Sequence, residues 1–274
     1  MEKQMRILSI GAHQDDADTS AAGLLWKLHD AGWQIRLLSL TDGSAGSYRL
    51  DLTREALARR RTEEAAASGR LLDARYDVFD NPDGQLLPTL ANREALIRYI
   101  RRFRPDVIVT NRPNDYHADH RSTALLVQDA SFLLTVPRIC ADTPCMTHTP
   151  PILFWSDSFQ RPYPHRADLI VPMSEARVGQ LTQLAACHEC QYFDWLLWPD
   201  NMDKAAWPRD AQRSALRARF LHTTAAARDA QEAALIEKYG ADTARSIAHV
   251  ECYEISEYGA DPTDEFRRIA EQPE

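Results

Sequence analysis

The chain has 274 residues, of which 44% are hydrophobic and 26% charged, and its formal net charge is -8. These proportions are typical of a globular protein that buries a sizeable core without disulfide bonds. A net negative charge without a basic stripe excludes a dedicated nucleic-acid-binding protein. No apolar run approaches the roughly 20 residues that a membrane helix requires, so we also expect no membrane span.

The five cysteines, an odd number, indicate reduced thiols and not a disulfide framework. The N-terminus lacks the charged, apolar and cleavage regions of a signal peptide, and we therefore expect a cytoplasmic protein. Cys187 and Cys190 form a CxxC pair, a pattern also found in zinc and redox sites. Because the sequence has no second CxxC to complete a structural zinc site, we interpret both as buried, unreactive thiols.

Short apolar runs alternate with longer amphipathic segments in the first part of the chain. The runs MRILSI, IRLLSL, DVIVT and DLIVP predict buried parallel strands. The amphipathic segments predict helices over Ser20–Ala31, Leu52–Leu72 (with Asp51 as a candidate cap), Arg93–Phe103 and Ser122–Leu134. This βαβα order predicts an α/β fold with a mostly parallel sheet and helices on both faces.

The later part of the chain is richer in helical patterns. It predicts a strand within Arg166–Met173, helices over Ser174–Cys190 and Asp210–Lys238, and a closing strand over Ala248–Ser256. Between the two helices lies an aromatic stretch with Trp195, Trp198 and Trp207, which we interpret as core or as a sugar-stacking surface. No change in composition marks a boundary. We therefore predict a single domain, 1–274, with a core over 1–173 and an α-rich C-terminal elaboration over 174–274.

Two groups of histidine and aspartate follow predicted strands. His13, Asp15 and Asp16 come directly after the first strand, and a polar loop with His117 and His120 follows a later one. Buried charges are costly unless they are paired or bind an ion. Because the carboxyl ends of parallel strands meet at one edge of a sheet, both groups are expected to face one crevice.

Histidine and carboxylate are suitable ligands for zinc and related divalent metals. His13 and Asp16 are three residues apart across a turn, so both can point at one ion, and one histidine of the later loop can complete the set. A free carboxylate can then accept a proton from water, and a second histidine can stabilise an oxyanion. Taken singly, the first group could be a helix cap and the second an ordinary polar loop. Their joint occurrence after two strands favours a metal site.

The same segments resemble the PIG-L or LmbE-like metal-dependent de-N-acetylases. GAHQDDAD and YHADH resemble the family's AHPDD and HPDH signatures. TDGSAGS, LARRRTEEAAASGRLLDA, NPDGQL, HECQ and HVECYEISEYG resemble its other segments in the same order. Gln14 replaces the usual proline, and Ala17 replaces the usual glutamate. The resemblance implies a Rossmann-like fold and hydrolysis of an N-acetyl group, typically on a glucosamine unit.

Carried onto this chain, the resemblance implies Zn²⁺ held by His13, Asp16 and His120, with another divalent metal such as Fe²⁺ as an alternative. Asp15 would be the general base and His117 the oxyanion stabiliser. Asp119 would orient His117 and tune its charge.

Three further residues are candidates for binding the substrate. Arg61 and Glu64 are spaced to share a helix face, which suits substrate binding or a surface ion pair. Asp83, in the segment NPDGQL, could accept sugar hydroxyls or simply belong to a turn.

We therefore predict a zinc-dependent N-deacetylase that uses a zinc-activated water to remove an acetyl group from a small amino-sugar conjugate. Family members are often homo-oligomers, so the resemblance makes a homo-oligomer a candidate assembly. The alternative is a metal-binding protein without deacetylase activity that serves in binding or assembly. Asp15 and His117 argue against it, because neither is needed merely to hold metal. A dinucleotide-binding protein is excluded, since GAHQDDADTSAAG lacks the GxGxxG spacing.

Overall fold

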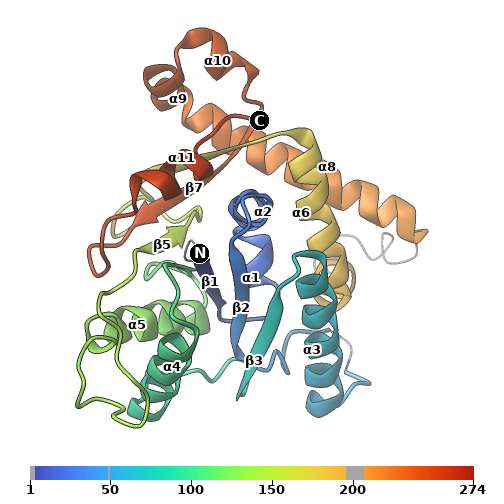
Figure 1. Ribbon diagram of the computed structural model, residues 1–274. Helices are drawn as coiled ribbons and strands as arrows, with labels where there is room; N and C mark the ends of the chain where they lie inside the picture. Colours follow the sequence, from blue (N-terminus) through green and yellow to red (C-terminus); the bar gives the residue numbers. More distant parts are fainter. Residues whose placement is uncertain (1–3, 49, 196–206) are drawn as a thin grey trace.

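The computed structural model describes residues 4–48, 50–195 and 207–274, and Figure 1 shows a central sheet with helices around it. Within these residues seven strands form one sheet in the order β3-β2-β1-β4-β5-β7-β6. The strands are β1 (Arg6–Gly11), β2 (Gln34–Thr41), β3 (Arg75–Asn81), β4 (Val107–Thr110), β5 (Ile152–Trp155), β6 (Leu169–Met173) and β7 (His249–Ile255). Only β7 runs antiparallel to its neighbours, β5 and β6. The predicted mostly parallel α/β fold is confirmed.

Helices cover both faces of this sheet. They are α1 (Asp16–Thr19), α2 (Ala22–Asp30), α3 (Arg54–Leu71), α4 (Leu90–Phe103), α5 (Ala118–Leu133), α6 (Glu175–Cys187), the π-helix η1 (Cys190–Trp195), α8 (Arg209–Ala230), α9 (Glu232–Tyr239), α10 (Ala241–Ser246) and α11 (Asp264–Ala270). None of those in the described ranges combines the length and hydrophobicity needed to cross a membrane.

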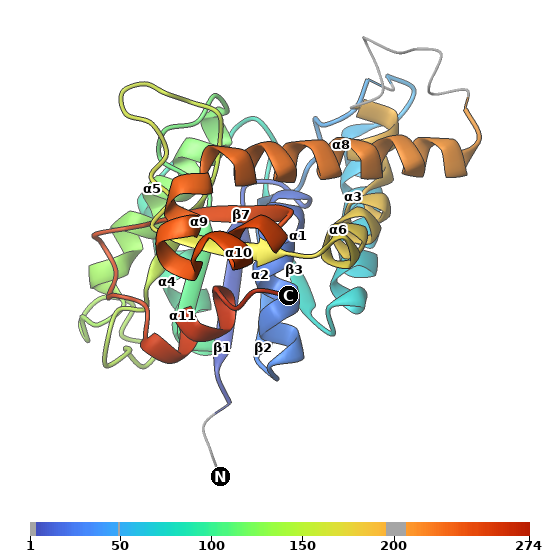
Figure 2. The same cartoon turned by 90° about the horizontal axis from the view of Figure 1, so that it is seen from above.

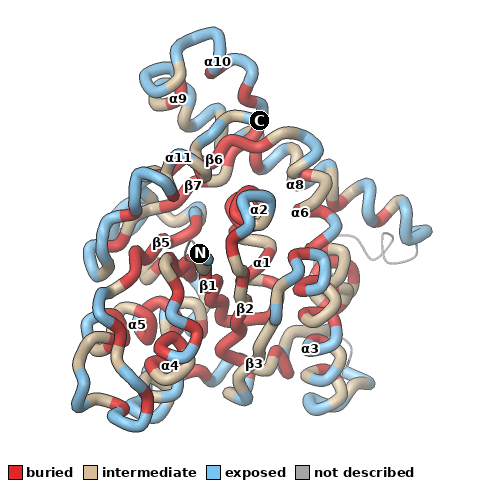
Figure 3. Tube along the Cα trace, viewed as in Figure 1, coloured by how far each residue is buried: buried red, intermediate tan, exposed pale blue. Residues whose placement is uncertain are grey.

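The core forms two layers because side chains alternate along each strand. On β1, Ile7 faces a cluster built with α2, α6 and α11, whereas Leu8 and Ile10 face a cluster built with α4 and α5. Figure 3 shows burial concentrated in the strands and α2. The carboxyl ends of β1 and β4 therefore lie side by side at one edge, supported from both faces.

The C-terminal elaboration is joined to the core by the sheet itself. Its strand β7 pairs with β5 on one side and β6 on the other. Figures 1 and 2 show α8, α9 and α10 at this end of the sheet. Because a strand from the last part of the chain completes the core sheet, we infer that the chain folds as one unit.

Several boundaries differ from the sequence-based predictions. Strands β3 and β5 were not predicted: β3 is a half-exposed edge strand rich in charged residues, and β5 has only four residues. The cap of α3 is Thr53, whose side chain accepts the N–H of Ala56 at 3.2 Å, and not Asp51. The single helix expected over Asp210–Lys238 is two helices, because the chain leaves the helical conformation at Gln231. After this break, Leu235 packs into a hydrophobic cluster with residues of β6 and β7.

Of the tryptophans in the aromatic stretch, Trp198 and the side chain of Trp195 lie outside what the structure describes. Trp207 is 40% exposed and does not line the crevice at the ends of β1 and β4.

Glu251 on β7 links the C-terminal elaboration to the helix that follows the HQDD segment. Ala21, at the start of α2, offers no side-chain cap. The Glu251 carboxylate takes this role across the fold, accepting the N–H groups of Gly23 at 2.7 Å and Leu24 at 3.1 Å. A carboxylate at a helix N-terminus satisfies amides that have no partner within the helix and interacts favourably with the helix dipole.

Glu251→Ala is expected to lower the free energy of unfolding by about 2 kcal/mol, because two amides at the start of α2 lose their acceptor. Denaturant unfolding followed by circular dichroism measures this loss. Tyr253→Phe is the matched control, because it removes only a hydroxyl that donates to the same carboxylate at 2.8 Å. It should lower the free energy of unfolding by less than Glu251→Ala does. An Ala variant as stable as the wild type would refute the capping role.

Candidate active site

The HQDD segment is shaped by Gly11, the last residue of β1. A Cβ atom at Gly11 would lie 2.5 Å from the Asp16 Cβ and 2.8 Å from the Ala17 backbone nitrogen, so the chain can fold back here only with glycine. Asp16 Oδ2 then accepts the backbone N–H groups of Ala12 and His13, both at 3.0 Å. The Asp16 carboxylate is thereby fixed at the carboxyl edge of the sheet.

The second group of residues comes from the loop after β4 and the start of α5. Asn111, which directly follows β4, accepts the N–H of Ala12 at 3.1 Å and so ties the ends of β1 and β4 together. The ring centres of His13 and His117 are 4.7 Å apart, and those of His13 and His120 are 5.1 Å apart. The two motifs therefore lie in one crevice, as their positions after two parallel strands predict.

Three side-chain atoms in this crevice form a compact triangle. His13 Nδ1 lies 3.2 Å from His120 Nε2 and 3.6 Å from Asp16 Oδ2, and the latter two atoms are 3.4 Å apart. Zinc with bonds of about 2.0–2.1 Å and tetrahedral angles needs ligand atoms about 3.3–3.4 Å apart. The triangle therefore fits a tetrahedral divalent metal with one position left open.

Each histidine of the triangle has its second ring nitrogen against carboxylates. His13 Nε2 lies 3.2 Å from Asp83 Oδ1 and 3.4 Å from Asp119 Oδ2, and His120 Nδ1 lies 3.0 Å from Asp115 Oδ2. Carboxylates in this position keep the proton on the nitrogen that they contact, and they leave the other ring nitrogen, which belongs to the triangle, free to bind a metal. The contacts of the second ring nitrogens thus select the same two nitrogen atoms, His13 Nδ1 and His120 Nε2, as the triangle does.

Two other groups of residues come close enough to hold an ion: His13, His117 and His120, and His13, Asp83 and Asp119. We favour the triangle because its three interatomic distances are close to those of a tetrahedral zinc site. It also leaves Asp83 and Asp119 to orient His13.

The electrostatics of the triangle suit a cation. Burial lowers the pKa of His13, but hydrogen bonds to Asp119, Asp16 and Asp83 outweigh burial and raise that pKa well above its usual value. Burial also acts to raise the pKa of Asp16, yet His120 and His13 hold it far below the ordinary range. Positive charge is therefore strongly favoured between these groups, and a divalent metal supplies it.

His117 is held as a hydrogen-bond donor toward the crevice. Its Nδ1 accepts the backbone N–H of Asp119 at 3.1 Å, so the proton of the neutral ring sits on Nε2. Burial, followed by the nearby His13 and His120, lowers the pKa of His117. The expected pairing of Asp119 with His117 is found, but it is made by the backbone N–H of Asp119. The Asp119 carboxylate acts to raise the pKa of His117 against the larger opposing effects, and its close contact is His13 at 3.4 Å.

Asp15 points into the crevice beside the triangle and pairs with Arg61 on α3. Arg61 donates to Asp15 Oδ1 at 2.9 Å, and the arginine is 3% exposed. Burial, and then the charge of Asp16, raise the pKa of Asp15, although Arg61 opposes them. A Cβ atom at Gly46 would lie 2.0 Å from an Arg61 nitrogen, so the glycine of TDGSAGS makes room for the guanidinium.

A cavity of about 290 Å³ opens over these groups. It is lined by His13, Asp15, Asp16, Ala45, Gly46, Arg61, Asp83, Gly84, Tyr116, His117, His120 and Gln191. Arg61 and Asp83 thus border the cavity, as expected for substrate residues. Hydrogen bonding to His13 outweighs the burial of Asp83 and lowers the pKa of its carboxyl to about 2, so this carboxyl is ionised at neutral pH.

Glu64, the third residue expected to bind substrate, does not border the cavity. Its carboxylate accepts the backbone N–H of Cys190 at 3.2 Å and pairs with Arg60 at 3.1 Å. The expectation is therefore corrected: one helical turn beyond Arg61, Glu64 faces the chain of the HECQ segment and holds Cys190, next to Gln191 in the cavity wall. Cys190 is buried, as predicted, whereas Cys187 is only half-buried, and none of the five cysteines forms a disulfide in the structure.

Sequence reasoning missed three residues of the site. Asp115 supports His120, Gln191 borders the cavity, and Tyr116 stands at its mouth, 70% exposed and stacked on Phe159 with 6.1 Å between ring centres. Gln191 lies within HECQ and Tyr116 within YHADH, so the motifs themselves could have identified both residues as part of the site. Asp115 precedes the second motif and is revealed only by the fold.

Comparison with known proteins agrees with the predicted resemblance. The sequence model of the PIG-L family, described as GlcNAc-PI de-N-acetylase, matches residues 8–131. The diacetylchitobiose deacetylase of Thermococcus kodakarensis is 28% identical over 199 residues, which cover 70% of this chain and 73% of that protein. The resemblance to PIG-L and LmbE-like proteins is confirmed.

Solved structures share the fold. An inhibitor complex of N,N'-diacetylchitobiose deacetylase from Pyrococcus horikoshii superposes with a TM-score of 0.67 at 21% identity, over 95% of this chain and 88% of that one. A 4-carboxy-2-hydroxymuconate hydratase from Pseudomonas putida superposes with a TM-score of 0.71 at 18% identity, over 96% and 99%. At these identities the likeness concerns the fold alone, and the chemistry has to be argued from the site.

Asp115→Asn is expected to weaken metal binding by about 10- to 100-fold, because the amide lacks the charge that holds the proton on His120 Nδ1. Competition with a chromophoric chelator measures the dissociation constant. Asp210→Asn, an exposed position on α8, is the matched control and should bind metal as the wild type does. Unchanged affinity in Asp115→Asn would show that His120 is not a ligand through Nε2.

Proposed function

We propose that this chain is a metal-dependent N-deacetylase that removes an acetyl group from a small amino-sugar conjugate. The observation that carries the proposal is the triangle of His13 Nδ1, Asp16 Oδ2 and His120 Nε2, with Asp15 and His117 beside it in one cavity. A site that only stored metal would need neither of the last two side chains. The alternative of a non-catalytic metal-binding protein is therefore disfavoured.

Zinc is the proposed metal, held by His13, Asp16 and His120, with Fe²⁺ as the alternative. When bound, such a metal lowers the pKa of water to about 7 and polarises a carbonyl oxygen. The chain's own contribution is to keep the three ligand atoms fixed, through the backbone amides on Asp16 and the carboxylates behind both histidines.

Asp15 is the proposed general base. It does not belong to the ligand triangle, and burial raises the pKa of its carboxyl, which suits a group that must accept a proton. Asp15 takes a proton from the attacking water as the new C–O bond forms. It then returns this proton to the departing nitrogen as the C–N bond breaks, so that acetate and a free amine leave.

His117 is the proposed oxyanion donor. The amide bond from Asp119 to Nδ1 keeps the imidazole neutral with its proton on Nε2, and the ring borders the cavity. A fixed N–H donor stabilises the negative charge that develops on the acetyl oxygen.

The cavity supports a substrate of sugar size. Ionised Asp83 and the guanidinium of Arg61 offer acceptors and donors to hydroxyl groups, and Tyr116 offers an aromatic face at the mouth. The relative from Thermococcus kodakarensis is named for an acetylated disaccharide, which agrees with this class of substrate. A cytoplasmic location, suggested by the free cysteines, and a homo-oligomeric assembly are further parts of the proposal.

Acetate release from a panel of N-acetylated amino sugars, including N-acetylglucosamine and N,N'-diacetylchitobiose, tests the function. The zinc-loaded wild type is expected to release acetate. Asp15→Asn should lose nearly all of this activity and keep its metal, because the amide still accepts from Arg61 but cannot take a proton. Metal content by elemental analysis is the control, and an active Asp15→Asn would remove Asp15 from the mechanism.

His117→Ala is expected to lower kcat by about two to three orders of magnitude, the loss typical of one oxyanion donor, with KM nearly unchanged and metal retained. Steady-state kinetics and elemental analysis give these values. His148→Ala, at an exposed position away from the cavity, is the matched control. If His117→Ala loses its metal, His117 is a metal ligand. If neither the rate nor the metal content changes, His117 has no catalytic role and its loop is only structural.

A further inference from the structure

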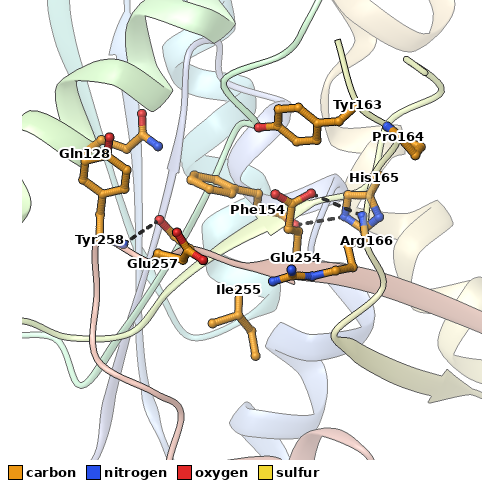
Figure 4. A pocket seen from close by; sticks show the side chains of 11 residues that line it. Gln128, Phe154, Tyr163, Pro164, His165, Arg166, Glu254, Ile255, Glu257 and Tyr258 are labelled. Carbon is orange, nitrogen blue, oxygen red and sulfur yellow. Dashed lines mark hydrogen bonds between the residues drawn. The ribbon is translucent and has the colours of Figure 1, made fainter. Parts of the chain in front are cut away.

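A second cavity, larger than the one at the metal triangle, opens beside the β5–β7 pair. Its volume is about 530 Å³, and it shares no lining residue with the first cavity. Figure 4 shows Gln128 and Tyr258 at one end, Tyr163, Pro164 and His165 at the other, and Phe154 and Glu254 between them. A hollow of this size accommodates a small molecule and has no role in the chemistry proposed above.

The walls of this second cavity are held from behind by Arg112, whose side chain is fully buried. Arg112 donates to the Tyr163 carbonyl at 2.8 Å, lies 4.8 Å from the centre of the Tyr163 ring, and approaches Glu254 at 3.5 Å. It is further paired with Asp157 at 3.0 Å. The cavity is therefore preformed, which lowers the entropy lost when a ligand binds.

The polar atoms on the walls are mainly acceptors. His165 Nε2 donates to the Phe154 carbonyl, at 3.4 Å, so the neutral ring leaves Nδ1 as an acceptor. Burial lowers the pKa of His165, which favours this neutral form. Glu254 accepts the N–H of Arg166 at 3.2 Å through one oxygen, and Glu257 is exposed with no ion-pair partner in the described part of the chain.

The charges around the cavity do not balance. The charged residues that line the cavity are the carboxylates of Glu254 and Glu257 and the guanidinium of Arg166. Arg166 is paired with Asp168 at 2.6 Å, and Arg112 approaches Glu254 from behind at 3.5 Å. Arg267 lines the adjoining cavity together with Glu257. The lining itself therefore carries one net negative charge, and Glu257 is its exposed carboxylate, open to a cation from the solvent.

We propose that this second cavity binds a small sugar that carries a free amino group. The aromatic rings of Tyr163, Phe154 and Tyr258 offer apolar surface to the faces of a pyranose ring. The acceptors on His165, Glu254 and Gln128 receive hydroxyl hydrogens, and Glu257 pairs with the ammonium group. The proposal does not depend on deacetylase activity, because no residue of the first cavity takes part.

Isothermal titration of the full-length protein with glucosamine tests the proposal, with no turnover measured. Wild type is expected to bind glucosamine at a site where glucose binds at least about tenfold more weakly, since glucose lacks the ammonium group. Glu257→Gln and Tyr258→Ala should each weaken this site about tenfold, the size expected for one lost charge-assisted hydrogen bond or one lost aromatic face. Glu237→Gln, an exposed carboxylate on α9, is the matched control and should bind as the wild type does.

Binding of glucosamine at the first cavity can be distinguished from binding at the second, because neither Glu257→Gln nor Tyr258→Ala would weaken it. The proposal is overturned if every glucosamine site of the wild type is insensitive to Glu257→Gln and Tyr258→Ala. Equal affinity for glucose at the sensitive site would overturn the amino-sugar assignment. Both substituted side chains are exposed, so circular dichroism should show unchanged folding.

Discussion

The site depends on the way Asp16 folds back over the end of β1. Two backbone amides, those of Ala12 and His13, bind the same carboxylate oxygen that faces the imidazoles of His13 and His120. This is possible only because Gly11 has no side chain. With that oxygen fixed, the rings of His13 and His120, which are 107 residues apart in the sequence, can converge on it. Fixed ligands of this kind keep a metal site rigid without loop rearrangement.

The remaining charged groups of the crevice are arranged around this point. Asp83 and Asp119 stand behind His13, and Asp115 stands behind His120, so each ligand ring is oriented by a carboxylate. Arg61 offsets the charge of Asp15, the carboxylate that we propose as the general base. Buried carboxylates are tolerated here because each has a cation, an imidazole or a backbone amide as its partner.

Local signals located the motifs but not every role within them. The apolar runs of β1, β2 and β4 and the residues after them were predicted because strand and turn patterns are local. Glu64 contacts Cys190 and does not border the cavity, and the Asp119 carboxylate contacts His13 while its backbone contacts His117, since helix spacing and adjacency in sequence do not decide which partner a side chain meets. Edge strand β3 and the short β5 lacked a continuous apolar run, and Asp115 and Glu251 act across the fold on groups far away in sequence.

The sequence by itself determined the fold class, the strands β1, β2 and β4 with helices between them, and the chemical identity of the residues at the strand ends. These follow from short-range periodicity and from the cost of leaving charges buried without partners. Only the tertiary structure decided which nitrogen of His13 and of His120 faces Asp16, and that Nδ1 of His117 accepts a backbone N–H. It also decided that the last strand, β7, caps the helix after the HQDD segment. Those properties depend on hydrogen bonds between segments that only folding brings together, and no local pattern encodes such distances.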